Sequence, residues 1–492
     1  MIPVSRSPAI VIAAGLYALG TAAIAVWASR RTRSAGDFFV AGRRIGPVTL
    51  GLGSMAVALS GFTFIGGPGL FYDRGFGALF IFLPVSITSS LSACLLGKRL
   101  SLLGEARGLV TIPEAIGARY GCRTAQGLAG VAILVAIVGY LATNLLALGL
   151  VIDSLFDTGV GPGIWIGAAA VIAYSISGGI LAGIYTDVFQ GLVMALASFL
   201  VFLVTLEVGD GLAGMTRTIL EREPGWLSPW GEFSPLAAVS LFFVFSVGSL
   251  GQPHVIHKFY LLRDPLKLRW YPLAMTLAMI VVLLVILGVG FATKVLVLRG
   301  AIPPLSHPDE ATPAFLLRYA SPALAGVLFA GVVAAIMSTV NSFLNIGAAA
   351  LVRDLPGALG RRPHSELRAA RLATLALGTV AAIAAQASGT LVVLLGVFGW
   401  GLFAATLVPA LALGLNWAGG TRLGALASMS TGLGLTLVGE LLGFLRVYSF
   451  PDGVTVSGAA LVLSLLVYLV VSVLSRRGSA PPAPDVRLIM ES

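Results

Sequence analysis

The stretch FAGVVAAIMSTVNSFLNIGAAALVRD, residues 329–354, decides how the rest of the chain is interpreted. It overlaps a segment without Asp, Glu, Lys or Arg from Tyr319 to Val352, which exceeds the about 20 residues of one membrane crossing. At about 100° per residue in a helix, one face of this stretch carries small and polar side chains, with Thr339 at its edge: Gly331, Ala335, Ser338, Asn341, Ser342 and Asn345. Such a face is costly against lipid, so we expect it to contact protein or water.

Two interpretations of the hydroxyls on this face remain open from the stretch alone. Ser and Thr in an apolar helix often donate to the backbone carbonyl four residues earlier, which would make them structural. Neutral oxygens on a close-packed helix face also suit a dehydrated small cation, because hard cations take oxygen ligands. Other parts of the sequence are needed to separate the two roles.

The composition indicates an integral membrane protein. Of the 492 residues, 57% are hydrophobic and 11% are charged, and the mean hydropathy is +0.97, whereas soluble proteins carry about 25% charged residues. The net charge of +10 does not indicate a nucleic-acid partner, because the basic residues lie in short loops where they set topology. Cys94 and Cys122 do not indicate a disulfide framework. The four scattered histidines form no metal-ligand pattern, which argues against a metalloenzyme.

Thirteen apolar segments are long enough to be membrane spans. The first is expected to be retained, because it is long for a signal peptide and lacks a convincing cleavage site. The predicted spans are 8–29, 46–71, 77–97, 124–156, 161–179, 183–206, 235–256, 271–298, 321–350, 370–388, 390–416, 423–446 and 455–475.

The loops between these spans predict the orientation. With the N-terminus outside, most of the 31 Lys and Arg residues fall in cytoplasmic segments, with dense groups at 30–44, 98–123, 258–269 and 353–371. The positive-inside rule therefore places the N-terminus outside and the C-terminus in the cytoplasm, which requires an odd number of spans. We expect the short tail from Arg476 to be disordered.

Two of the spans are interrupted by Gly and Pro. The interruptions are SGFTFIGGPG (60–69) and SVGSLGQPH (246–254), and each opens a block of five spans. Interrupted helices at corresponding positions indicate an inverted-repeat transporter whose site lies at the breaks. The alternative is a pair of ordinary proline kinks.

Seven segments, in order along nearly the whole chain, carry a family resemblance. They are FFVAGRRIGP (38–47), SGFTFIGGPG (60–69), TIPEAIGARYG (111–121), YSISGGILAGIYTDVFQG (174–191), GQPHVIHKF (251–259), AAIMSTVNS (334–342) and VPALALGLNW (408–417). Together they resemble the sodium:solute symporter family, whose bacterial members include the proline, pantothenate and sialic acid carriers.

The resemblance implies an all-α integral membrane protein of 13 transmembrane helices with a LeuT-like five-plus-five inverted repeat, one leading helix and two trailing helices. The implied parts are the leading helix and basic loop (1–45), the first repeat (46–206), an external loop (207–234), the second repeat (235–417), the trailing helices (418–475) and a cytoplasmic tail (476–492).

The resemblance also implies a sodium site between the first broken core helix and the eighth core helix. Carried over by position, its ligands are the carbonyls of Ala56, Leu59 and Ala335 and the hydroxyls of Ser338 and Thr339. The match is complete, and it favours the ion site over the purely structural interpretation of the hydroxyls.

Asp187 matches an acidic residue of the family in the segment GIYTD. By resemblance it steers sodium release inward or completes a second sodium site with Ser338, Asn341 and Ser342. Some members carry small hydroxyl residues at the last two positions, and Asn341 departs from this pattern, which leaves the second ion open. The structural alternative is a helix-end carboxylate that accepts from backbone N–H groups.

A substrate cavity is expected at midmembrane between the two breaks. By comparison with the family, Phe245 and Ser249 stand where proline carriers have larger aromatic residues, so proline is not favoured as the solute. Segment 79–94 lacks the acidic residue that sugar carriers use, which argues against a sugar. With no Lys or Arg predicted in the cavity, a carboxylate would depend on helix N-termini, side-chain amides or the sodium ion. The candidate lining residues are Phe62, Thr63, Tyr140, Asn144, Phe245, Ser249, Gln252 and Trp400.

Sodium-coupled import of a small organic solute, a monocarboxylate-like or pantothenate-like acid, is therefore the predicted function. Proton-coupled transport and a transporter-fold membrane sensor with a separate partner are the alternatives. An enzyme is not expected, because the spans offer no paired carboxylates and no nucleophile beside a base. We expect a multi-pass protein of a bacterial-type inner membrane, active as a monomer, that binds sodium, its solute and the lipid bilayer.

Overall fold

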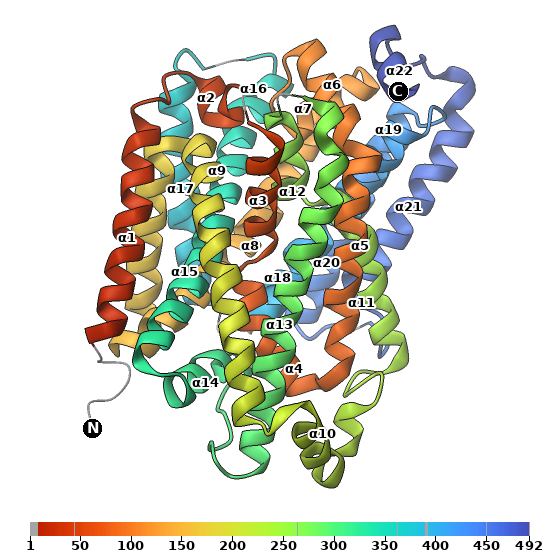
Figure 1. The fold of residues 1–492 in the computed structure, drawn as a ribbon. Coiled ribbons are helices and arrows are strands. Elements are labelled where there is room, and N and C mark those ends of the chain that lie inside the picture. The colour runs from red at the N-terminus through yellow and green to blue at the C-terminus, as the bar shows by residue number, and fades with distance from the viewer. Residues whose placement is uncertain are drawn as a thin grey trace.

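Long apolar helices standing side by side make up the computed structural model, which describes residues 8–43, 45–262, 264–361, 363–388, 392–448 and 450–491 (Figure 1). Twelve helical runs of these residues are long and apolar enough to cross a membrane. The same residues form no β-strand, apart from an isolated parallel bridge between Ile45 and Leu262. The helices are α1 Pro8–Ser29, α2 Ala35–Val40, α3 Pro47–Ala58, α4 Gly67–Arg74, α5 Leu79–Ser92, α6 Lys98–Arg107, α7 Ile112–Tyr120, α8 Arg123–Phe156, α9 Val160–Val208, α10 Gly211–Arg222, α11 Pro235–Gly248, α12 Pro253–Ile256, α13 Tyr271–Leu298, α14 Ala311–Tyr319, α15 Pro322–Ala349, α16 Leu355–Ala358, α17 Glu366–Ala387, α18 Val392–Leu407, α19 Gly414–Asn416, α20 Arg422–Phe444, α21 Val456–Ser475 and α22 Pro484–Glu491.

The predicted spans agree closely with these helices. The spans at 8–29 and 271–298 coincide with α1 and α13. The span at 390–416 corresponds to α18, a π-helical turn and α19, and its first two residues lie outside the described part. Helix α1 begins at one end of the bundle and α22 lies at the other (Figure 1), as an odd number of crossings requires.

The predicted span at 46–71 is not one continuous helix. Helix α3 ends at Ala58, Leu59 is extended (φ −96°, ψ 110°), and the chain resumes as a π-helical turn, Phe62–Gly66, that leads into α4. Neither half has the about 20 residues of a full crossing. The count of thirteen spans therefore stays a prediction.

Helix α9 joins the two spans predicted at 161–179 and 183–206 without a loop. Its turning point is Gly179, with φ 55° and ψ −143°. A Cβ on this residue would lie 2.6 Å from the Phe38 ring and 2.7 Å from the Phe38 carbonyl oxygen. Glycine alone meets both the positive φ and the close approach.

Helix α15, which contains the stretch 329–354 up to Ala349, lies in the interior of the bundle. It packs on α9, α1 and α8, and from Ala325 nearly all its side chains are buried. A Cβ on Gly331 would lie 2.7 Å from the Ala197 Cβ of α9, so small residues set the close approach of the two helices. The expectation that this polar face contacts protein rather than lipid is confirmed.

The prediction that the tail from Arg476 is disordered is wrong. Residues Pro484–Glu491 form α22, which docks on α6. Val486 is buried, Arg107 donates to both carboxylate oxygens of Asp485 at 2.6 Å, and Arg99 donates to the Met490 carbonyl. The proline-rich segment PPAP (481–484) favours disorder. However, apolar residues four apart, Val486 and Met490, give α22 one face that packs.

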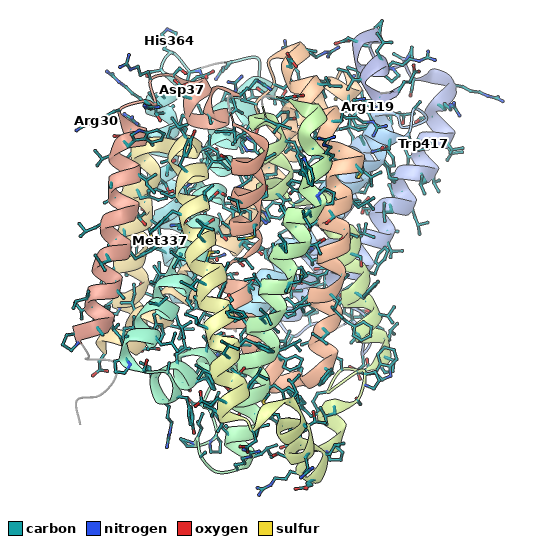
Figure 2. The ribbon with its side chains drawn as sticks, viewed as in Figure 1. Arg30, Asp37, Arg119, Met337, His364 and Trp417 are labelled. Atoms are coloured by element: carbon teal, nitrogen blue, oxygen red, sulfur yellow. The ribbon has the colours of Figure 1, made fainter. Side chains whose placement is uncertain are left out.

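Several polar side chains lie at the end of the bundle that carries α22. Arg30, Asp37, Arg119 and His364 lie there (Figure 2). Arg119 donates to the carbonyls of Gly414 (2.6 Å) and Trp417 (3.1 Å), which fixes α7 to the chain after α18.

Candidate functional site

The break between α3 and α4 is held open by a side chain of α8. Asn144 accepts from the Gly61 N–H at 3.0 Å and donates to the Tyr140 carbonyl at 2.9 Å. A Cβ on Gly61 would lie 2.9 Å from Ala147 and 3.1 Å from the Asn144 oxygen. Asn144, expected in the substrate cavity, therefore satisfies a backbone group that the break leaves without a helical partner.

The carbonyl freed at Leu59 faces α15. The Thr339 hydroxyl lies 3.1 Å from the Ala335 carbonyl and 3.5 Å from the Leu59 carbonyl. The structure thus brings three of the five predicted sodium ligands together at the break. The carbonyl of Ala56, a fourth, accepts from the Leu59 N–H at 3.2 Å within the same turn.

Ser338, the fifth predicted ligand, points to a buried ion pair. Its hydroxyl donates to Asp187 at 2.6 Å, and the other oxygen of Asp187 lies 2.7 Å from the ammonium of Lys258. Lys258 also donates to the Gly53 carbonyl at 2.7 Å. The Lys258 and Asp187 side chains are 1% and 0% exposed, and buried charges persist in proteins because they are paired in this way.

Lys258 was not singled out from the sequence. It lies in the 3₁₀ turn His257–Leu261 that follows the second broken helix, within the segment GQPHVIHKF. The available signal was that Lys258, the first residue of the basic group at 258–269, lies only six positions beyond the break at Gln252. Its partner on α9 is 71 residues away in the chain, and no local pattern reveals that proximity.

The donor set at the break fits sodium. Ala56, Leu59, Ala335, Ser338 and Thr339 are all fully buried, and they offer only neutral oxygens, as a dehydrated hard cation requires. Asp187 adds a carboxylate one hydrogen bond beyond, through Ser338.

Further along α15 lies a group of buried polar atoms that have no hydrogen-bond partner among the described residues. The group consists of both amide atoms of Asn341 and the hydroxyl of Ser342. Asn341 faces α9, since a Cβ on Gly183 would lie 2.3 Å from its amide nitrogen. Buried polar atoms left unpaired are costly, so this place suits an ion or a water molecule.

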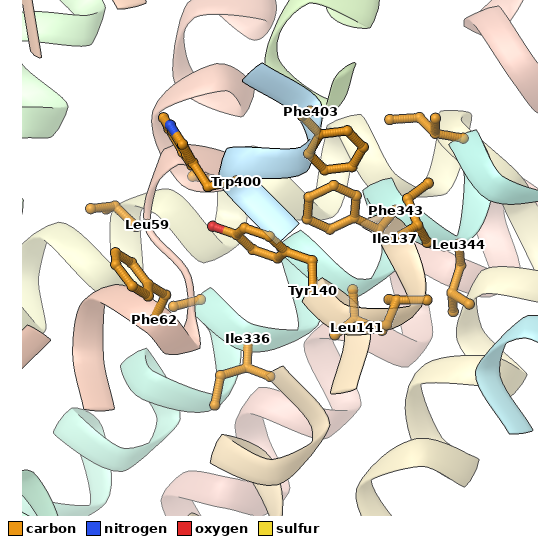
Figure 3. Close-up of a cluster of buried hydrophobic side chains, with 14 of the residues drawn as sticks. Leu59, Phe62, Ile137, Tyr140, Leu141, Ile336, Phe343, Leu344, Trp400 and Phe403 are labelled. Carbon is orange, nitrogen blue, oxygen red and sulfur yellow. The ribbon is translucent and has the colours of Figure 1, made fainter. Parts of the chain in front are cut away.

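Between the two breaks lies a small cavity with aromatic walls, about 40 Å³ in volume. Five of the eight candidate residues line it: Phe62, Thr63, Tyr140, Phe245 and Trp400. Phe245 stacks on Phe62 (centroids 6.0 Å apart) and on Trp400 (5.1 Å). The Tyr140 hydroxyl points toward the space between Trp400 and Phe62 (Figure 3).

Ser249 and Gln252, like Asn144, are not among the lining residues. The Ser249 hydroxyl donates to the Ser246 carbonyl at 2.9 Å. The Gln252 amide donates to the carbonyls of Gly248 (2.9 Å) and Trp400 (3.3 Å). These contacts stabilise the second break and fix it to α18.

His254 lines the cavity and was not predicted there. Its ring lies 4.5 Å from that of Phe343, 5.9 Å from Tyr140 and 6.4 Å from Trp400, between centroids. The Nδ1 atom of His254 and the Nε1 atom of Trp400 are buried without a hydrogen-bond partner in the described part of the chain. The sequence feature that could have predicted His254 is its position two residues after the break at Gln252, where the helix resumes.

Comparison with known proteins gives one family and several relatives. The family model for the sodium:solute symporter family matches residues 38–432. The high-affinity proline transporter PutP of Bacillus subtilis is 28% identical over 429 residues, which cover 84% of this chain and 89% of the relative. The sodium/pantothenate symporter of Escherichia coli is 28% identical over 465 residues, which cover 91% of this chain and 92% of the relative.

A solved structure of a Na⁺-coupled sialic acid symporter, in a substrate-bound outward-open state, has a similar fold. It aligns with a TM-score of 0.79 and 17% identity, over 96% of this chain and 99% of that chain. The similarity confirms the predicted all-helical membrane fold of the LeuT type.

Proposed function

Because the chain belongs to the sodium:solute symporter family, we propose that it imports a small organic solute together with sodium by alternating access. The observation that carries the proposal is the meeting of the Thr339 hydroxyl with the Leu59 and Ala335 carbonyls at the break of the first core helix. It supports a sodium site formed by Ala56, Leu59, Ala335, Ser338 and Thr339.

Sodium at this site would connect α3 to α15. It would thereby favour the arrangement in which the break faces Thr339, and the cavity one turn beyond Leu59 would be ordered for the solute. Each sodium ion that enters the cell contributes about 2.3 kcal/mol per 100 mV of membrane potential, in addition to its concentration gradient.

The cavity supports a small carboxylate as the solute. Trp400 Nε1, a hydrogen-bond donor, and His254 Nδ1, which donates in one tautomer, have no hydrogen-bond partner among the described residues, and the stacked rings of Phe62 and Phe245 offer an apolar wall. Proline and pantothenate, named for two relatives, both carry a carboxylate. The cavity of about 40 Å³ would have to widen to admit a molecule of this size.

We infer one sodium ion per transport cycle rather than two. The charge of Asp187 is already balanced by Lys258 at 2.7 Å, so a second ion at Asn341 and Ser342 would have to displace the ammonium or do without the carboxylate. The same buried pair supports proton coupling as the second candidate, because it offers a titratable group one hydrogen bond from Ser338.

A binding measurement on the purified protein distinguishes the candidates. The melting temperature is recorded with a panel of small carboxylates and amino acids, first in sodium and then in potassium, since a ligand of the native state raises it by mass action. Sodium symport predicts a shift for one class of compound that requires sodium. A shift of equal size in potassium would contradict it and favour protons.

By the positive-inside rule, we assign the end with α22 to the cytoplasm and the start of α1 to the outside of a bacterial-type inner membrane.

A further inference from the structure

A cleft of about 690 Å³ opens at the end of the bundle that carries α22. Its charged lining consists of four arginines and two glutamates: Arg107, Arg123, Arg353, Arg361, Glu114 and Glu366. These residues come from α6, α7, α8, η11 (Ala350–Asp354), the α16–α17 connection and α17. The cleft is remote from the sodium and solute sites, and the transport proposal makes no use of it.

Two of the four arginines are already neutralised. Arg353 lies 3.2 Å from Glu114 and 3.5 Å from Glu366, and Arg107 makes its two-pronged contact with Asp485. Arg123 and Arg361 have no ion pair and no side-chain hydrogen bond to any described residue. Counted with Asp485, the cleft has four positive and three negative charges, a net charge of +1, and Arg123 and Arg361 are the two arginines left without an ion pair.

The backbone fixes where these two arginines lie. Arg361 ends a Schellman motif after α16, in which the Arg361 N–H donates to Pro356 (2.8 Å) and the Gly360 N–H donates to Gly357 (3.1 Å). Gly360 has φ 71°, and a Cβ there would lie 3.3 Å from a terminal nitrogen of Arg123. The Arg123 guanidinium thus lies directly over the turn that presents Arg361.

Arg123 is also the first residue of α8, a helix of 34 residues. The positive end of the helix dipole points into the same place. An anion between the Arg123 and Arg361 guanidinium groups offsets their mutual repulsion, and planar guanidinium groups match phosphate oxygens in pairs.

We propose that this cleft binds a phosphate group through Arg123 and Arg361. The phosphate belongs either to the headgroup of an anionic phospholipid in the adjacent leaflet or to a soluble phosphorylated compound. Its binding connects the start of α8 to the α16–α17 connection and so stabilises this end of the bundle.

The test compares two double variants of the full-length protein that remove the same charge. Arg123→Gln/Arg361→Gln removes the proposed ligands. Arg30→Gln/Arg477→Gln is the control, because both arginines are exposed and outside the cleft. Arg30 lies at the end that carries α22 (Figure 2), and Arg477 lies in the connection from α21 to α22. In one arm, the melting temperature in detergent is titrated with inorganic pyrophosphate against sodium chloride of equal ionic strength. In the other, the protein is placed in nanodiscs of phosphatidylcholine with and without phosphatidylglycerol.

We expect the wild type and the control to be stabilised in at least one arm. The cleft variant should need about tenfold or more ligand for the same stabilisation, because it lacks both charge-assisted donors to the phosphate. Stabilisation by pyrophosphate alone identifies a soluble ligand, and stabilisation by phosphatidylglycerol alone identifies a lipid. Equal behaviour of the two double variants in both arms, or no stabilisation of the wild type in either, overturns the proposal.

Discussion

The ammonium of Lys258 lies 2.7 Å from the carboxylate of Asp187, and both side chains are buried beside the proposed sodium site. The pair joins the end of the second broken helix to α9, and Ser338 extends it to α15. Three elements, the turn after α12, α9 and α15, therefore meet at one ion pair.

Removal of one member of this pair should be more harmful than removal of both. Lys258→Met leaves a buried carboxylate without a counter-charge, and we expect it to lower the free energy of unfolding by about 3–5 kcal/mol. Lys258→Met/Asp187→Asn leaves no charge and should recover a large part of that loss. Unfolding in mixed detergent measures both. If the double variant is as unstable as Lys258→Met, an uncompensated charge is not the cause.

Loss of the Thr339 hydroxyl should weaken sodium dependence with little loss of folded protein. Thr339→Ala removes one proposed oxygen ligand, and we expect the sodium concentration for half-maximal uptake to rise about tenfold, equivalent to about 1.4 kcal/mol. Thr374→Ala is a matched control, because Thr374 on α17 is equally buried and donates to a carbonyl four residues earlier. The assignment fails if the two variants have the same sodium dependence.

Substitution of Asn144 should show whether this residue stabilises the break or contacts the solute. Asn144→Ala leaves the Gly61 N–H unsatisfied at the break, which should cost about 1–3 kcal/mol of stability. Thr143→Ala, at the next position, removes only a helix back-bond and should be much milder. A variant that keeps its melting temperature but loses solute affinity would show that Asn144 contacts the solute after all.

Substitution of His254 should weaken solute binding and leave the sodium dependence unchanged. His254→Phe keeps the ring packing against Phe343 and Tyr140 but removes the unpartnered nitrogen. We expect about tenfold weaker binding of a carboxylate solute, with sodium dependence unchanged. Binding is measured by the solute-dependent melting shift, and an unaltered shift would exclude His254 from recognition.

The docking of α22 should not respond to pH in the neutral and mildly acidic range. The hydrogen bonds from Arg107 lower the pKa of Asp485 to about 2, from an ordinary value of 3.8. A carboxyl group whose pKa falls on folding stabilises the folded state above its ordinary pKa, and that stabilisation is lost as the pH falls toward about 2. A fluorescent probe near Glu491 should therefore report release on Arg107→Gln or in high salt, but no change between pH 5 and pH 8. Release within that range would contradict the assignment.

The sequence predicted those features that depend on local composition. The bounds of α1 and α13 follow from apolar length, and the breaks follow from Gly and Pro within spans. Ser338 and Thr339 stand out as hydroxyls within a span that has no charged residue, and the family resemblance implied their role as sodium ligands.

Features that depend on distant parts of the chain could not be predicted in this way. In the sequence, Lys258 is one of several basic residues at a span end, and only the fold shows that it contacts Asp187. The sequence predicts Asn144 as a cavity residue, and only the fold shows that it accepts from the Gly61 N–H. Helix α22 has too few residues to be stable alone, and its order comes from the surface of α6.

The turn at Gly179 limits how Asp187 can be repositioned. Asp187 follows Gly179 by about two helical turns, and no loop intervenes to absorb a change in direction. Phe38 fills the space at the turn, and its carbonyl accepts from Asn345 of α15 at 2.8 Å. The position of the Asp187 carboxylate is therefore set by the junction at which α2, α9 and α15 meet. A methyl group added at position 179 would displace the chain at the turn and so misalign Asp187, about 12 Å further along α9.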